Sequence, residues 1–356
     1  MNSPLEALER DIGAEFARYA DLDLPARFSD LQREWCAVRQ RCGLLDAGFR
    51  GLLRLTGSDR TTFLQGMITN DVVKLRNGEG TYAALLNIQG KVVSDLRVYV
   101  LAEELWLDVP AARANVVRET LEHHIIADDV EFVADDQAAL VVLEGPQAAR
   151  MVMGVFGENV EELPPLAHHE LQLDGNPVRL AAVTHTGESG YFVFGNPATA
   201  ASLWQRCRAA GAEPVGMEAL DLLRLEAGIP WCGRDMDEGM LISEVGLEAA
   251  ISYRKGCYLG QEVVERIAAR GQVHRKLVGL LCAGQVVPSP DSKLVRAGSE
   301  VGWITSAAWS PARVGIIALG YVRSEHWDPG VEMQVALPQG STTARVVPLP
   351  FYVRPS

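Results

Sequence analysis

Two landmarks recur along the chain at almost the same spacing, and this recurrence limits the folds that the chain can adopt. Gly57 and Gly145 each stand between a predicted strand and a predicted helix, 88 residues apart. Pro110 and Pro197 each stand near the start of another predicted helix, 87 residues apart. The shared order predicts a duplicated β-α-β-β-type unit over about 50–125 and 139–210, rather than a solenoid repeat. Chance recurrence of a common α+β order is the alternative.

The rest of the chain divides at about residue 275. A helix is expected over residues 5–20, where Leu5, Leu8, Ile12 and Phe16 fall on one face. From Lys276 onward, short strands are punctuated by Gly, Pro and Ser, which predicts a small β-barrel or sandwich. The expected division is therefore 1–275, with two interleaved α+β subdomains, and 276–356. A duplicated pair of sheets leaves a crevice between its halves, where ligands tend to bind.

Composition narrows the class of protein. A chain of 356 residues, 48% hydrophobic and 22% charged, is typical of a globular protein with two or three domains. The net charge of −13 makes direct nucleic-acid binding unfavourable. No apolar run approaches the roughly 20 residues that cross a membrane, and the N-terminus resembles no targeting peptide. We expect a cytoplasmic protein whose cysteines are reduced and scattered: Cys36, Cys42, Cys207, Cys232, Cys257 and Cys282.

One cysteine has an unusual sequence environment. Cys257 follows Lys255 and lies between Gly256 and Gly260, just before a predicted amphipathic helix. A basic neighbour and a helix start both favour a thiolate, so Cys257 and Lys255 are candidate catalytic residues. A small buried hydrophobe at the start of a helix is the alternative. No histidine or cysteine spacing points to a metal site.

The stretch around this cysteine resembles a known family signature. Lys-Gly-Cys-Tyr-Leu-Gly-Gln-Glu at 255–262 is similar to the signature of YgfZ-type folate-binding proteins, which belong to the glycine-cleavage T-protein superfamily. Weaker matches occur in the same order over nearly the whole chain: 41–46, 55–59, 63–66, 86–91, 94–96, 186–190, 223–230 and 302–306.

The resemblance implies a fold and a set of site residues. Its fold has three subdomains around a cavity that takes tetrahydrofolate: two duplicated ferredoxin-like α+β subdomains and a C-terminal β-barrel. Asp95 matches a folate-facing aspartate and Glu188 a pterin-facing glutamate; a carboxylate can accept both N–H donors of a pterin edge. Without the resemblance, both would be ordinary strand or turn residues. Tyr82 and Asn87 are candidates for the same cavity. Arg224 is either a folate contact or a helix residue paired with Asp221 or Glu226.

Departures from the T-protein pattern favour the YgfZ type. Leu220 stands where aminomethyl-transferring T proteins usually have arginine, and Asp46-Ala47-Gly48-Phe49-Arg50-Gly51 replaces Asp-Val-Ser-His-Met-Gly. Such T proteins also lack a cysteine at the position of Cys257. The leading expectation is a tetrahydrofolate-binding accessory protein in iron–sulfur cluster assembly or repair, with assembly or client proteins as partners and a possible link to tRNA modification. The alternatives are a folate-dependent aminomethyltransferase and an interaction scaffold with a vestigial folate site, so enzymatic activity is left open.

Overall fold

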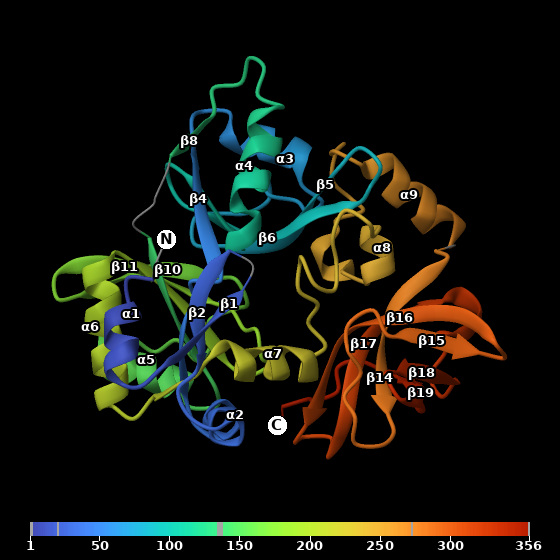
Figure 1. Ribbon diagram of the computed structural model, residues 1–356. Coiled ribbons are helices and arrows are strands. Elements are labelled where there is room, and N and C mark those ends of the chain that lie inside the picture. Colours follow the sequence, from blue (N-terminus) through green and yellow to red (C-terminus); the bar gives the residue numbers. More distant parts are fainter. Residues whose placement is uncertain (1–2, 20, 134–137, 272, 355–356) are drawn as a thin grey trace.

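The first repeated unit is an antiparallel sheet of five strands covered by helices. The computed structural model describes residues 3–19, 21–133, 138–271 and 273–354. The strand order in this sheet is β5-β6-β7-β4-β8 (Figure 1). Its elements are β4 (Arg50–Thr56), α3 (Arg60–Met67), β5 (Gly80–Leu86), β6 (Val92–Val100), β7 (Leu105–Pro110), η1 (Ala111–Arg113), α4 (Ala114–Glu122) and β8 (Glu131–Val133).

The second unit repeats this order of elements. Its six-stranded sheet runs β10-β11-β12-β9-β3-β13, in which only the short β13–β3 pair is parallel among the described strands. Both units follow the order β-α-β-β-β-α, and in both the first strand pairs with the fourth. The predicted duplication is therefore confirmed. The elements are β3 (Gly43–Asp46), β9 (Ala139–Glu144), α5 (Ala148–Phe156), β10 (His168–Leu173), β11 (Asn176–Ala182), β12 (Gly190–Gly195), α6 (Pro197–Ala209) and β13 (Glu213–Pro214).

The two landmark glycines are required by close backbone contacts. Gly57 has φ +100°, and a Cβ at this position would lie 2.0 Å from the carbonyl oxygen of Asp129. Gly145 has φ +134°, and its Cβ would lie 2.5 Å from the carbonyl oxygen of Arg41. Any side chain would clash at either turn, so both positions need glycine.

The C-terminal part is a closed six-stranded barrel in the order β14-β17-β16-β15-β18-β19. Val and Ile side chains from β16, β17 and β18 fill its interior. The predicted fold class, duplicated α+β subdomains followed by a β-barrel, is confirmed. The elements are β14 (Arg275–Cys282), β15 (Lys293–Arg296), β16 (Ser299–Ser310), β17 (Gly315–Arg323), η3 (Ser324–His326), β18 (Glu332–Leu337) and β19 (Gly340–Val347).

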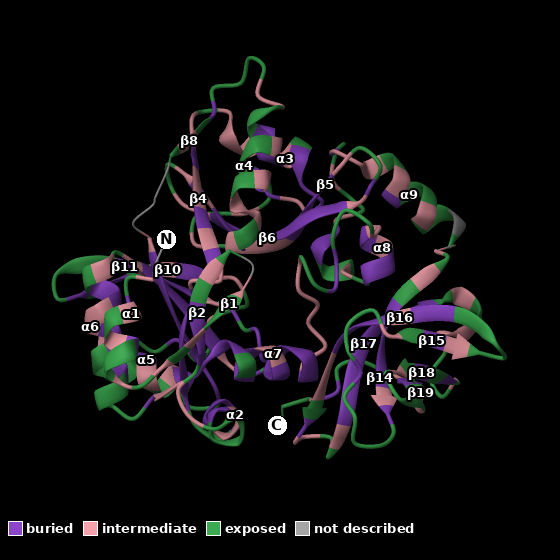
Figure 2. Ribbon diagram, in the orientation of Figure 1, coloured by how far each residue is buried: buried purple, intermediate pink, exposed green. Residues whose placement is uncertain are grey.

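The connecting elements join these three parts. Helix α7 contacts β2 and α2 on one side and β16 and β17 of the barrel on the other, so almost all of its residues are buried (Figure 2). No helix in the described ranges has the length and apolar character needed to cross a membrane. The remaining elements are α1 (Glu6–Asp11), β1 (Glu15–Tyr19), β2 (Leu22–Arg27), α2 (Leu31–Gln40), α7 (Met217–Glu226), α8 (Ile242–Val245), η2 (Glu248–Ala250) and α9 (Gln261–Arg270).

The helix expected over residues 5–20 is much shorter in the structure. Gly13, with φ +86°, follows the end of α1, and the amide of Ala14 donates to the carbonyl of Glu9. The chain then forms β1, which pairs with β2. Glycine in this left-handed conformation ends the helix, so the helical spacing of Phe16 is a coincidence.

Candidate functional site

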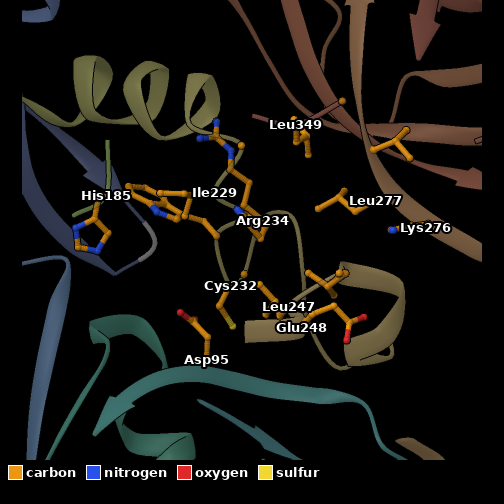
Figure 3. A pocket seen from close by; sticks show the side chains of 18 of the residues that line it. Asp95, His185, Ile229, Cys232, Arg234, Leu247, Glu248, Lys276, Leu277 and Leu349 are labelled. Carbon is orange, nitrogen blue, oxygen red and sulfur yellow. The ribbon is translucent and has the colours of Figure 1, made fainter. Parts of the chain in front are cut away.

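A cavity of about 1440 Å³ lies where the first sheet, the loop after β11, the loop after α7 and the barrel meet. Strands β4, β5 and β6 contribute the lining residues that we call the floor, the segment 228–234 contributes those that we call the wall, and β14 and β19 contribute others from the barrel. Figure 3 shows Asp95 of β6 beside Cys232, with Leu277 of β14 farther away. Ligand pockets of roughly 300–1,000 Å³ are usual, so this cavity can hold a large ligand.

Asp95 provides a carboxylate on the cavity floor. It lies on β6, is 7% exposed, and lines the cavity together with Tyr82 of β5. The Tyr82 hydroxyl donates a hydrogen bond of 3.1 Å to Oδ2 of Asp95. Burial, and then the negative charge of Asp95, raise the pKa of Tyr82 well above its usual value, so the hydroxyl stays protonated. The structure therefore brings together two of the site residues expected from the sequence.

Two arginines lie on the same floor and share one carboxylate. Asp108 of β7 is fully buried between its neighbouring strands β6 and β4. Its Oδ1 accepts from Nε of Arg50 at 2.6 Å, and its Oδ2 accepts from Nη1 of Arg97 at 2.7 Å. Both arginines line the cavity. Arg50, Arg97 and Asp108 were not predicted as site residues from the sequence. The two-residue spacing of Asp95 and Arg97 on a predicted strand nevertheless places both side chains on one face.

Aromatic rings and a thiol form the adjoining wall. The rings of Phe49 and Trp231 stack with centroids 5.7 Å apart and planes at 25°, and both residues line the cavity. Cys232 and Asp95 lie close together in the cavity (Figure 3). Burial, and then the Asp95 carboxylate, raise the pKa of Cys232 to about 11, so it is a protonated thiol at neutral pH.

Glu188, Arg224 and Asn87 lie outside the set of residues that line the cavity. Glu188 is buried and forms an ion pair of 3.0 Å with Arg39. Arg224 is fully buried and forms ion pairs with Asp221 and Asp235. Of its two expected partners, Asp221 is therefore found, whereas Glu226 does not pair with Arg224 among the described residues.

Asn87 closes the turn between β5 and β6. Its Oδ1 accepts from the backbone amides of Gln89 at 3.0 Å and Lys91 at 3.1 Å. Its expected place in the cavity, like the folate contacts of Glu188 and Arg224, stays a prediction.

Cys257 and Lys255 also lie away from the cavity lining. The Lys255 ammonium donates to three backbone carbonyls, those of Gln65 and Ile68 at 2.6 Å and of Asn70 at 2.9 Å. Burial lowers the pKa of Lys255 to about 8. Cys257 is exposed. Within the described ranges, no three metal-binding side chains lie together.

The cavity fits a folate. Its volume lies above the usual range of ligand pockets, the stacked rings of Phe49 and Trp231 line it, and its floor carries an Asp95 carboxylate that can accept N–H donors. The residues present are therefore suited to the tetrahydrofolate that the sequence led us to expect.

Known proteins resemble this chain over its whole length. Residues 5–255 match the family model of the GCVT N-terminal domain, and residues 275–352 match that of the glycine cleavage T-protein C-terminal barrel domain. An aminomethyltransferase of Prochlorococcus marinus (strain MIT 9303) is 32% identical over 100% of this chain and 98% of its own length. An aminomethyltransferase of Synechococcus elongatus is 34% identical over 99% of this chain and 96% of its own length.

A solved structure shows the same fold. The crystal structure of glycine cleavage system aminomethyltransferase T from Bartonella henselae superposes with a TM-score of 0.93, at 25% identity, covering 99% of this chain and 98% of that one. Aminomethyltransferases of this family use tetrahydrofolate, so the expected cofactor is confirmed.

These similarities overturn the leading functional expectation. The relatives are named aminomethyltransferase, which contradicts an accessory role in iron–sulfur cluster assembly and favours the alternative. The iron–sulfur partners and the link to tRNA modification have no support among them. The expectation rested on the motif around Cys257 and on the departures at Leu220 and 46–51, whereas the aminomethyltransferases align with the chain from end to end. With both of its family models matched and relatives aligned end to end, the chain belongs to the glycine cleavage T-protein family.

Proposed function

We propose that this protein is a folate-dependent aminomethyltransferase. The observation that supports it most directly is Asp95, a carboxylate held by a tyrosine hydroxyl on the floor of a cavity that fits a folate. The names of the full-length relatives support the same reaction class.

In this proposal, Asp95 acts at the reacting carbon–nitrogen bond. Tetrahydrofolate, when bound, supplies the nitrogen that accepts the one-carbon unit. The Asp95 carboxylate stabilises cationic character in the aminomethyl group and accepts a hydrogen bond from its protonated amine. Tyr82 orients that carboxylate, and the Phe49–Trp231 pair packs against a planar ring. The segment 228–234 and the barrel strands β14 and β19 also line the cavity.

Turnover with an aminomethylated lipoyl carrier tests the proposal. The wild-type protein should release ammonia from this carrier only when tetrahydrofolate is added. Asp95→Asn should lower kcat by about 10²–10³-fold, the effect of removing one preorganised electrostatic contact from a transition state. Asp174→Asn, which changes an exposed aspartate paired with Arg206, serves as the matched control and should retain activity. Absence of tetrahydrofolate-dependent turnover in the wild type would refute the proposal.

A further inference from the structure

The cavity floor carries two opposite charges that are bonded to different partners. Asp95 and Arg97 are two residues apart on β6, so both side chains leave the same face of the strand, and both line the cavity. Asp95 accepts from Tyr82, whereas Arg97 pairs with Asp108. No ion pair joins Asp95 to Arg97 in the part of the chain that the structure describes. The floor is therefore bipolar, with a gap between its negative and positive ends.

The positive end holds two guanidinium groups. Arg50 and Arg97 are both more than nine-tenths buried, and both depend on the single carboxylate of Asp108. Arg50 also donates from Nη2 to the Asp108 carbonyl at 2.9 Å, a contact that adds no negative charge. Two guanidinium groups thus share the one carboxylate that is hydrogen-bonded to them, while the charges of Asp95 and Glu144 act on Arg97 without a hydrogen bond.

His185 adds no charge to this end of the floor. Its Nε2 lies 2.8 Å from Nη2 of Arg97, and because a guanidinium can only donate, Nε2 must be the acceptor. The ring proton then sits on Nδ1, which faces the Glu144 carboxylate at 3.5 Å. Burial, followed by the charges of Arg97 and Arg50, lowers the pKa of His185 well below its usual value, so the ring is neutral.

Unused donors of the arginine pair remain open to the cavity. Arg50 Nη1 and Arg97 Nε have no hydrogen-bond partner among the described residues. Neither nitrogen is among the fully buried polar atoms that lack a partner, so neither is sealed inside the protein. Because both side chains line the cavity, these N–H groups are available to a ligand. Guanidinium groups with free, fixed donors recognise carboxylates by paired hydrogen bonds.

We propose that the cavity floor binds a small zwitterionic amino acid, with its carboxylate at Arg50 and Arg97 and its ammonium group at Asp95. A simple anion would satisfy only the arginine pair, and a simple amine would satisfy only Asp95. A zwitterion satisfies both ends and fills the gap between them. The inference uses the cavity of the proposed function and assigns a second ligand class to it, but it does not depend on the transfer reaction.

Calorimetric titration of the whole protein with four small probes tests the inference. Glycine and N-methylglycine carry both charges, whereas methylamine and acetate each carry one. Both zwitterions should bind at least about tenfold more tightly than either singly charged probe, since each end adds a charge-assisted hydrogen bond. Equal binding of all four probes, or no binding of the zwitterions, would overturn the inference.

Variants locate the two ends. Arg50→Gln should weaken glycine binding about tenfold or more and leave methylamine binding unchanged, and Asp95→Asn should weaken glycine and methylamine together. If Arg50→Gln does not fold, glycine affinity is measured in Arg50→Lys, which keeps the charge but loses the guanidinium donors. Arg179→Gln removes a half-buried arginine outside the cavity, paired with Glu170, and should leave glycine binding intact. Unchanged glycine affinity in both folded Arg50 variants would contradict the site.

A second source of the carboxylate is the glutamyl tail of a folate. Comparing tetrahydrofolate with tetrahydropteroate, which lacks that tail, separates the two sources. If Arg50→Gln weakens only tetrahydrofolate and glycine does not bind the wild type, the arginine pair serves the tail and the inference fails. Because these measurements record binding, they remain informative whether or not aminomethyl transfer is observed.

Discussion

The carboxyl groups of Glu9 and Asp46 interact with each other in the protein interior. Glu9 lies on α1 with 0% exposure, and neither of its carboxyl oxygens has a hydrogen-bond partner among the described residues. Burial, and then the Asp46 carboxylate, raise the pKa of Glu9 to about 9, and burial raises that of Asp46 to about 6. At neutral pH the folded protein therefore holds a proton on Glu9.

This pair makes stability depend on pH. Between pH 4.5, the ordinary pKa, and about 9, the unfolded chain has lost the Glu9 proton while the folded state keeps it. The free energy of unfolding should therefore fall as pH rises through this window. Glu9→Gln should flatten the profile and raise stability at pH 8 by on the order of 1–2 kcal/mol. Urea unfolding from pH 5 to 9 measures this. Glu6→Gln, which changes a glutamate on the same helix that is paired with Arg10, should keep the wild-type dependence of unfolding free energy on pH. The same dependence in Glu9→Gln would show that Glu9 is not its source.

Tyr82→Phe should impair the proposed aminomethyl transfer without removing the Asp95 carboxylate. The variant deletes the hydroxyl that donates to Asp95 and leaves the ring in place. Loss of one hydrogen bond to a charged group should lower kcat/KM by about tenfold or more. Steady-state kinetics of the folded variant measures the loss, and a kcat/KM equal to that of the wild type would contradict a role for the hydroxyl in holding Asp95.

Lys255→Met should destabilise the segment that it holds. The variant removes the ammonium donor from three carbonyls between Gln65 and Asn70, at a cost of about 2 kcal/mol or more. Chemical denaturation measures the loss. Lys74→Met is the control: the Lys74 side chain is exposed and pairs with Asp71 among the described residues, so the effect should stay below about 1 kcal/mol. Equal effects of the two variants would show that the three carbonyl contacts contribute little.

Cysteine labelling should separate exposed from buried thiols. Burial raises the pKa of Cys42, Cys207 and Cys282 to about 12, whereas Cys257 is exposed. Site-resolved iodoacetamide labelling of native protein at neutral pH should therefore modify Cys257 well before those three. The comparison with half-buried Cys36 tests whether Cys257 is also activated: faster reaction at Cys257 supports activation, and equal rates leave exposure as its only distinction.

Removing Asp235 should be far more damaging than removing Asp221. Arg224 is fully buried, and its Nη1 pairs with Asp235, which is also fully buried. Burial opposes ionisation of Asp235, but Arg224 and the hydroxyls of Ser306 and Thr305 together lower its pKa. Asp235→Ala leaves a buried guanidinium without its main partner and should cost about 3–5 kcal/mol. Asp221→Ala removes a part-exposed partner and should cost less, so similar midpoints in thermal unfolding would contradict this ranking.

The fold was accessible from the sequence because local constraints recur in it. Gly57 and Gly145 are fixed by contacts that exclude any Cβ, so they mark the same turn in both units. The error over residues 5–20 has an equally local cause: apolar spacing continues past Gly13, but the left-handed backbone there ends the helix.

The site was only partly accessible. Asp95 and Tyr82 were found through family resemblance, and their pairing on adjacent strands places them together. Arg50 and His185 were missed because their contacts come from tertiary structure. Arg50 of β4 binds Asp108 of the neighbouring strand β7, and His185 comes from the second unit to contact Arg97. The ion pair between Glu188 and Arg39 could not be predicted from local sequence either, because the two residues lie 149 residues apart in the chain.

The loop that carries Asp235 belongs physically to the barrel, although it precedes the barrel in the chain. Asp235 accepts from Thr305 and Ser306 of β16, both at 2.6 Å, and its carbonyl accepts from the Tyr321 hydroxyl at 2.9 Å. A barrel exchanged between relatives at residue 275 would leave these hydroxyl groups facing a foreign loop. The unit that can be transplanted intact therefore includes the segment from Trp231 to Met236, and a chimera that respects this boundary preserves the junction between the cavity and the barrel.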